Sequence, residues 1–416
     1  MVRRNLTMDV ILQQVRVSFA LPVHFTNGVF ERENSLLASV LGAPPDPKPA
    51  AALVVVDDGV ARAHAGLIDR IGGYFQAHAG VLRLDGPVLV IPGGESAKND
   101  PGTLDRIHTA IHSAALCRHS YVIAVGGGAV LDVVGYAAAT AHRGIRLVRI
   151  PTTVLAQDDS AVGVKNGVNG FGKKNYYGTF APPFAVINDF TFLATLEDRD
   201  WRGGLSEAVK VALIKDPALF TFIEHHAAAL VARDAGVMEQ VIRRSAALHV
   251  AHIANGGDPF ELGSSRPLDF GHWAAHRLEH LTAHRVRHGE AVAIGLALDC
   301  TYSLLSGHLA ETSWRRIIDL LIALKLPVSV PELDAHLDIP DHPRSVLRGL
   351  AEFREHLGGE LTLMMLGDIG RAFDVHEVHT EGMIRSVEIL RMIQAAGTSA
   401  AASGAVPAAA SARGSS

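Results

Sequence analysis

The chain has 416 residues, 48% of them hydrophobic and 19% charged, which is typical of a globular protein with two domains. A formal net charge of −5 excludes a broadly basic surface for nucleic acid or for an anionic membrane. Its two cysteines, Cys117 and Cys300, are too few for a disulfide framework or a cysteine zinc site, so we expect a cytoplasmic protein. Apolar runs are too short for a membrane span, and Asp9 interrupts any signal-peptide pattern.

Short β-branched segments alternate with helical patterns through the first half of the chain. The strand-like segments are 53–58, 88–94, 120–128, 145–153 and 184–190, and helical patterns such as 61–78 lie between them. This alternation predicts an α/β domain with a doubly wound, mainly parallel, Rossmann-like sheet. Because ligands bind beyond the carboxyl ends of such strands, we expect a site at that edge.

Helical patterns dominate from about residue 197 onward, and one strand pair is expected at 359–370. The last residues are rich in Ala, Ser and Gly and have little to bury. We therefore expect three parts: an α/β domain over 1–195, a mostly α-helical domain over 196–393, and a disordered low-complexity tail over 394–416.

A glycine-rich turn at 126–128 joins a predicted strand to a predicted helix. There the backbone can approach a pyrophosphate, and the helix N-terminus supplies amide donors, although a plain tight turn has the same composition. Asp57 ends the first strong strand, where a carboxylate can accept hydrogen bonds from a ribose. Glu95 and Lys98 follow the next strand. Together these features predict a dinucleotide site, although the strict G-x-G-x-x-G fingerprint is absent.

The polar, glycine-rich segment 151–175 follows a buried-looking strand and is expected to line a cleft. Its Lys165, Lys174 and Asn175 could hold an anionic, hydroxylated substrate, or the lysines could simply be solvated. In the next apolar helix, Glu207 and Lys210 stand three residues apart on one face. Such a pair is either a structural ion pair or part of a site.

Five histidines recur at intervals of four in the segment 264–292: His272, His276, His280, His284 and His288. On one unbroken helix the outer two Cα atoms would lie about 24 Å apart, so only neighbouring histidines could share a metal ion. The apolar period is lost at 281–287, and a reversal of the chain there would bring the outer two together. The spacing alone leaves both arrangements open.

These segments, taken in order, resemble the 3-dehydroquinate synthase-like sugar phosphate cyclases. The similarity runs from about residue 54 to 369 and is carried by GGESAK, VGGGAVLDVVGYAAATAHRG, IPTTVLAQDDSAVGVKNGVN, GKKN, LATLEDRDWRGGLSEAVK, LDFGHWAAH and HGEAVAIGL. The resemblance implies a lyase with an NAD-binding domain, a helical metal domain, an active site between them and a homodimeric assembly. It also implies the reaction: transient oxidation by NAD⁺, elimination of phosphate, return of the hydride, ring opening and an intramolecular aldol closure.

The resemblance further implies residue roles. NAD would contact Asp57, Glu95, Lys98, Gly127, Gly128, Asp132, Thr152 and Thr153. A catalytic Zn²⁺ or Co²⁺ would be held by Glu207, His272 and His288, which requires the broken helix. Catalytic positions of the family match Asp159, Lys165, Lys210 and His276, the last beside the substrate phosphate. Substrate or phosphate positions match Lys174, Asn175, Arg354 and Arg143, and the family arginine at Arg143 reaches across the dimer interface.

Departures from the family pattern concern the substrate. 3-Dehydroquinate synthases hold a substrate carboxylate with a lysine, and with an arginine four residues before an asparagine. Here His249 stands at the lysine position, Ser265 at the arginine position with Arg266 displaced by one, and Asp269 at the asparagine position. An aspartate would repel a carboxylate, so we expect a neutral, hydroxylated substrate, sedoheptulose 7-phosphate. Arg266 could still reach a carboxylate.

His276 narrows the expected branch. In the 2-epi-5-epi-valiolone and desmethyl-deoxygadusol branches a proline is expected at this position, so its histidine resembles the 2-epi-valiolone synthase branch, which forms a C7 cyclitol. The nearest alternative is a 3-dehydroquinate synthase that acts on 3-deoxy-arabino-heptulosonate 7-phosphate. Other classes are an NAD-dependent polyol or glycerol-phosphate dehydrogenase on the same scaffold, and a non-catalytic binding protein.

Overall fold

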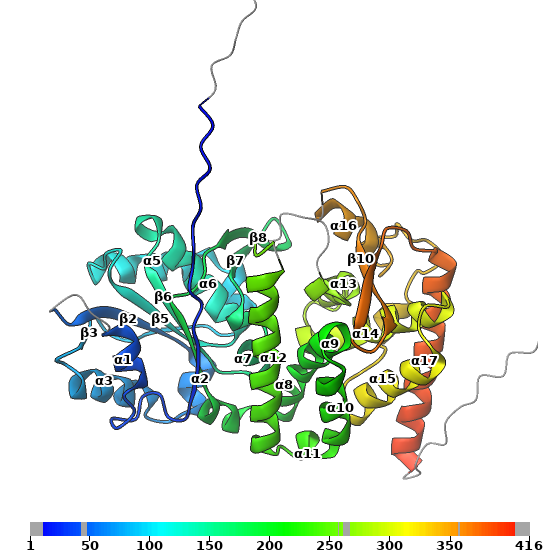
Figure 1. Cartoon of the computed structure of the whole chain (residues 1–416), viewed down its shortest axis with the longest axis horizontal. Coiled ribbons are helices and arrows are strands. Elements are labelled where there is room, and N and C mark those ends of the chain that lie inside the picture. The colour runs from blue at the N-terminus through cyan, green and yellow to red at the C-terminus, as the bar shows by residue number, and fades with distance from the viewer. Residues whose placement is uncertain (1–10, 43–47, 257, 261–266, 357, 404–416) are drawn as a thin grey trace, which may run out of the picture.

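A parallel α/β sheet and a mostly helical domain lie side by side along the long axis of the molecule (Figure 1). The computed structural model describes residues 11–42, 48–256, 258–260, 267–356 and 358–403. This arrangement confirms the predicted fold class. Among the helices of the described residues, none combines the length and the apolar character that crossing a membrane requires.

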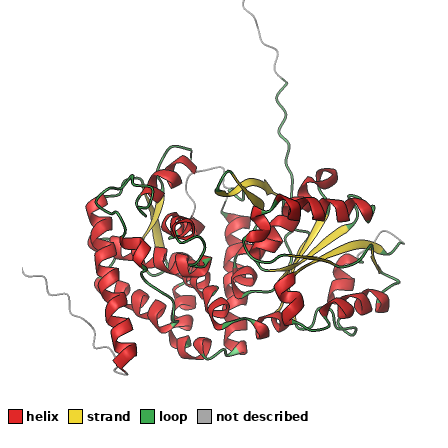
Figure 2. Ribbon diagram, turned by 180° about the vertical axis from the view of Figure 1, so that it is seen from behind, coloured by secondary structure: helices red, strands yellow, loops and turns green. Residues whose placement is uncertain are grey.

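The sheet runs in the order β1-β9-β6-β5-β2-β3, with β4 also paired to β2, and every pair is parallel. Its strands are β1 (Val23–Thr26), β2 (Ala50–Asp57), β3 (Leu82–Leu84), β4 (Leu89–Ile91), β5 (Tyr121–Gly126), β6 (Arg146–Pro151) and β9 (Ala185–Asp189). Residues 53–56 of β2 are buried without a break, as a strand covered on both faces requires. Figure 2 shows the sheet from behind, with helices on both sides of it.

Alternate residues of β2 enter different cores. Leu53 and Val55 pack with α5 and α6, whereas Val54 and Val56 pack with α1 and α3 on the opposite face. The helices of this half are α1 (Leu36–Leu41), α2 (Asp58–Ala63), α3 (Leu67–Ala77), α4 (Ser96–Asn99), α5 (Pro101–Ser113), α6 (Gly128–Thr140) and α7 (Val154–Asp158). The single helix expected at 61–78 is thus broken, and Gly66, with φ +73, starts the second helix from a left-handed conformation.

The segment 151–175 is more ordered than the sequence predicted. After α7 it forms an antiparallel hairpin of β7 (Lys165–Gly170) and β8 (Lys173–Phe180). Buried Arg149 on β6 holds its start, donating hydrogen bonds to the carbonyl oxygens of Ala161 (2.9 Å), Gly163 (2.8 Å) and Lys165 (2.7 Å). A polar segment with weak local propensity therefore takes its shape from a side chain of the sheet.

The second half is mostly helical, and the buried helix α14 (His288–Leu305) lies at its centre. The other helices of this half are α8 (Asp198–Gly203), α9 (Leu205–Lys215), α10 (Pro217–His225), α11 (Ala227–Val231), α12 (Ala235–Asn255), α13 (His272–Leu281), α15 (Glu311–Ala323), α16 (Arg348–His356) and α17 (Thr380–Ser403). Helix α12 stands between the sheet and the rest of this half (Figure 1).

The strand pair, the C-terminal end and the start of this half were each predicted from the sequence. The strand pair forms later than 359–370, as β10 (Leu363–Asp368) and β11 (Arg371–Val375). The tail was predicted from residue 394, whereas α17 continues through the alanine-rich stretch to Ser403; 404–416 lie outside the described residues, and the tail stays a prediction. Strands give way to helices between β9 and α8, and the domain boundary at 195 stays a prediction.

Candidate functional site

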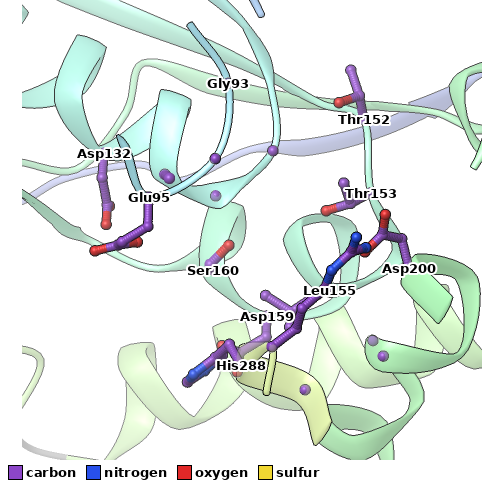
Figure 3. Close-up of a pocket in the computed structure, with 18 of the residues that line it drawn as sticks. Gly93, Glu95, Asp132, Thr152, Thr153, Leu155, Asp159, Ser160, Asp200 and His288 are labelled. Atoms are coloured by element: carbon purple, nitrogen blue, oxygen red, sulfur yellow. The ribbon is translucent and has the colours of Figure 1, made fainter. Parts of the chain in front are cut away.

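A cavity of about 990 Å³ lies between the carboxyl ends of the sheet strands and the helical domain. Figure 3 shows Gly93, Glu95 and Asp132 on one side of it and His288 on the other, with Asp159 between them. This is the edge of a parallel sheet at which ligands bind, and it is where the sequence predicted a site.

All the residues expected at NAD line one wall of this cavity: Asp57, Glu95, Lys98, Gly127, Gly128, Asp132, Thr152 and Thr153. Asp57 caps helix α2, its Oδ1 accepting from the Gly59 amide at 2.8 Å, and burial raises the pKa of its carboxyl group. Lys98 Nζ lies 2.8 Å from Asp132 Oδ2 and also donates to Asn175. A carboxylate at a strand end beside the N-terminus of α6 suits a dinucleotide.

The outer histidines of the row meet because the helix breaks between them. His272 begins α13 and His288 begins α14, and their Nε2 atoms lie 3.6 Å and 3.4 Å from Glu207 Oε1 on α9. One ligand atom from each of the three residues lies within 4.8 Å of the others. Glu207 is buried, and no donor of the described residues meets its carboxylate with hydrogen-bond geometry. One carboxylate oxygen and two imidazole nitrogens fit a zinc-type ion with an open position.

Backbone contacts fix where these ligands stand. A Cβ on Gly289 would lie 2.6 Å from the carbonyl carbon of Gly203, at the end of α8. A Cβ on Gly295 would lie 2.8 Å from the carbonyl carbon of Gly271, just before His272. Helix α14 therefore packs backbone to backbone against the end of α8 and the start of α13, which only glycine permits.

A buried charge cluster adjoins the three ligands. Lys210 Nζ lies 2.6 Å from Glu207 Oε2 and 3.5 Å from Asp159 Oδ1, and His249 Nδ1 lies 3.0 Å from the same Asp159 oxygen. Burial alone would raise the pKa of Glu207, but the Lys210 ammonium together with His288 and His272 outweighs burial and lowers that pKa to about 2. At neutral pH the cluster thus presents ionised carboxylates and one ammonium, which can stabilise negative charge on a substrate oxygen.

The hairpin and α13 form the other wall. Lys165, Lys174 and Asn175 line the cavity from the hairpin, and His276 faces it from α13, with its ring centroid 5.4 Å from that of His272. Lys174 Nζ lies 2.8 Å from Glu279 Oε1. At one end, Asp269, in the 3₁₀ turn Pro267–Asp269, lines the cavity together with His249. The hairpin thus adds the ammonium groups of two lysines, whereas Asp269 adds a carboxylate.

Sequence reasoning missed Glu279. This carboxylate is buried and contacts both Lys174 and His288. The sequence spacing could have identified it, because Glu279 stands seven residues after His272 and three after His276, on the same face of one helix. His284, the one further member of the histidine row at the cavity, was given no role from the sequence, and neither was His252, which also lines the cavity.

Two of the three predicted arginines, Arg143 and Arg354, are described by the structure, and neither lines the cavity. Arg143 lies in the 3₁₀ turn Ala141–Arg143 with φ +63 and faces a separate pocket of about 580 Å³ beside Cys117. Its expected role across a dimer interface stays a prediction, since the structure contains one chain. Arg354 is exposed on α16 and does not line the cavity, and its expected role at the substrate stays a prediction. Arg266, like Ser265, lies outside the described residues.

Comparisons with known proteins agree with this geometry. The 3-dehydroquinate synthase N-terminal model matches residues 88–203, and the C-terminal model matches 204–341. The 3-dehydroquinate synthase of Geobacter sp. (strain M21) is 37% identical over 291 residues, 69% of this chain and 80% of the relative. The 2-epi-5-epi-valiolone synthase of Streptomyces glaucescens is 34% identical over 354 residues, 84% of this chain and 85% of the relative.

A solved structure covers still more of the chain. ValA, the 2-epi-5-epi-valiolone synthase of Streptomyces hygroscopicus subsp. jinggangensis 5008, determined with NAD⁺ and Zn²⁺ bound, superposes with a TM-score of 0.79 at 31% identity. The match covers 92% of this chain and 99% of ValA. The sheet, the helical domain and the cavity between them therefore belong to one shared architecture.

Proposed function

The chain belongs to the 3-dehydroquinate synthase family of NAD- and metal-dependent sugar phosphate cyclases, and within it we propose that the substrate is sedoheptulose 7-phosphate. The product would be a C7 cyclitol of the 2-epi-valiolone type. Overall identity does not separate the substrates, because relatives with different activities are 37% and 34% identical to the chain. The proposal rests on the residues at the end of the cavity.

The observation that carries the proposal is the pair His249 and Asp269. Both line the cavity; His249 stands where 3-dehydroquinate synthases use a lysine for the substrate carboxylate, and Asp269 stands where they have an asparagine. His249 Nδ1 is already paired with Asp159 at 3.0 Å, and Asp269 adds a further negative charge. A substrate carboxylate would be repelled there, whereas the hydroxyl groups of a neutral keto sugar can donate to these acceptors.

The remaining residues have proposed roles in this reaction. When bound, NAD⁺ would supply hydride exchange with a ring alcohol, and the ion at Glu207, His272 and His288 would polarise the oxygen being oxidised. Lys210 and Lys165 would stabilise negative charge on substrate oxygens. The phosphate would be held by Lys174, Asn175 and His276, with Arg143 of a second subunit completing the site in a homodimer.

Phosphate release from two substrates tests the proposal. The enzyme is incubated with NAD⁺, Zn²⁺ and either sedoheptulose 7-phosphate or 3-deoxy-arabino-heptulosonate 7-phosphate. We expect release from the first substrate, and turnover of the second alone would overturn the proposal in favour of a 3-dehydroquinate synthase. Net accumulation of NADH would instead identify a dehydrogenase, because a cyclase recycles its cofactor. NMR of the product then gives its stereochemistry, and a 2-epi-5-epi product would contradict the branch inferred from His276.

A further inference from the structure

Glu279 connects two parts of the cavity that come from different halves of the chain. Its Oε2 lies 3.1 Å from His288 Nδ1, and its Oε1 lies 2.8 Å from the Nζ of Lys174 on β8. We propose that Glu279 is a positioning residue that orients His288 toward the metal ion and couples that ligand to the substrate-holding Lys174. The inference rests on the ligand set Glu207, His272 and His288 proposed above.

The chemistry of the imidazole ring supports this role. With Nε2 directed at Glu207 and the metal position, only Nδ1 can carry the ring proton, and it donates to the Glu279 carboxylate. A carboxylate acceptor fixes the ring and makes Nε2 a more basic ligand. The other histidine ligand differs, because His272 Nδ1 lies 3.1 Å from the carbonyl oxygen of Phe270, an uncharged acceptor. His288 is therefore the ligand that depends on a charged partner.

Burial makes the link to Lys174 consequential. The Glu279 side chain is 5% exposed, so little water screens its interactions with the imidazole and the ammonium. Lys174 and His288 compete for the Glu279 carboxylate. When a substrate phosphate attracts the Lys174 ammonium, the carboxylate can interact more strongly with His288. Removing Lys174 should then preserve or strengthen metal binding, whereas removing Glu279 should weaken it. A purely structural ion pair would weaken metal binding whichever partner is removed.

Zinc affinity of the whole enzyme tests the inference. Metal is removed with a chelator, and Zn²⁺ is titrated back against a chromophoric competitor. Glu279→Gln and Glu279→Ala should raise the zinc Kd about 10- to 100-fold, and Lys174→Met should leave it unchanged or lower it. The visible spectrum of the Co²⁺-loaded enzyme should shift in both Glu279 variants. Glu352→Gln is the matched control. Glu352 on α16 pairs at 3.1 Å with Arg277, which lies on α13 as Glu279 does, so neutralising it should change neither readout.

The outcomes separate this inference from the proposed ligand set. Zinc Kd values within twofold of the wild type in both Glu279 variants, with unchanged Co²⁺ spectra, would overturn it. His288→Ala should lose zinc affinity, and if it does not, the ligand set itself is wrong. Should Glu279→Ala fail to fold by circular dichroism, Glu279→Gln, which keeps the size of the side chain, decides.

Discussion

Replacing Gly93 with alanine tests the dinucleotide wall of the cavity, because an added methyl group has no room there. An ideal Cβ would lie 2.7 Å from Asp57 Oδ2 and closer still to Oδ1, well inside van der Waals contact. The backbone at Gly93 is in an ordinary conformation, so alanine introduces no φ strain. The carboxylate of Asp57 must therefore move.

Two losses follow from that movement. Asp57 caps helix α2 by accepting from the amides of Gly59 at 2.8 Å and Val60 at 3.4 Å, and losing a cap costs about 0.5–2 kcal/mol of stability. A hydrogen bond from the NAD ribose to this ionised carboxylate is worth about 1.5–3 kcal/mol. Since about 1.4 kcal/mol is tenfold in affinity, the NAD Kd should rise about 10- to 100-fold.

Isothermal titration with NAD⁺ and urea denaturation measure the two effects. Gly72→Ala on α3 is the matched control, because nothing lies within 4 Å of its ideal Cβ. Alanine in that helix interior should stabilise the protein by up to about 1 kcal/mol and leave NAD binding unchanged. An NAD Kd for Gly93→Ala within twofold of the wild type, or an equal rise in the control, would refute the reasoning.

Three other substitutions have clear expectations. Lys210→Met removes the ammonium that pairs with the buried carboxylate of Glu207 and with Asp159, so the metal-free protein should lose about 3–5 kcal/mol in urea denaturation, and phosphate release should fall at least about 100-fold. Arg149→Lys should lose most hydrogen bonds to the start of the hairpin, costing about 2 kcal/mol and raising the substrate KM. Burial lowers the pKa of His252 from 6.5 to about 4, so the unfolded chain binds the extra proton between these values, and stability rises with pH across that window. Acidification from pH 7.5 to 5 should therefore lower the free energy of unfolding by up to about 2 kcal/mol through His252. In urea titrations His252→Gln should remove this part of the pH dependence, whereas His119→Gln, at an exposed position, should retain it.

The main strands could be predicted because their signal is local. A central strand covered on both faces needs a continuous β-branched run, and residues 53–56 provide one. The hairpin β7–β8 lacked such a signal, since its glycines, lysines and asparagines have low strand propensity. Its order comes from Arg149, which is distant in the sequence from most of the residues it holds.

In the candidate site, too, some residues could be predicted from the sequence, and others are recognised only by their partners in the fold. Spacing left two arrangements for the histidine row, and the resemblance favoured the broken helix that brings His272 and His288 to Glu207. Glu279 was overlooked because an acidic residue on a polar helix face is common, and only its partners reveal its role. Arg354 was placed at the substrate by its position in the family pattern; its side chain is exposed on α16 outside the cavity, and its role stays a prediction.

The glycine contacts of α14 bear on how the protein acquires its metal. Because Gly289 and Gly295 seat this helix directly on neighbouring backbone, chain packing sets the separation between the Cα atoms of His272 and His288. If Glu207, His272 and His288 are the ligands, as proposed, the helical domain is a preassembled chelator whose ligands need little rearrangement when an ion enters. Unlike small zinc modules that fold only around their ion, this domain uses folding to create the coordination geometry. Exchange of the metal should then be governed by passage through the cavity, with the native fold preserved throughout.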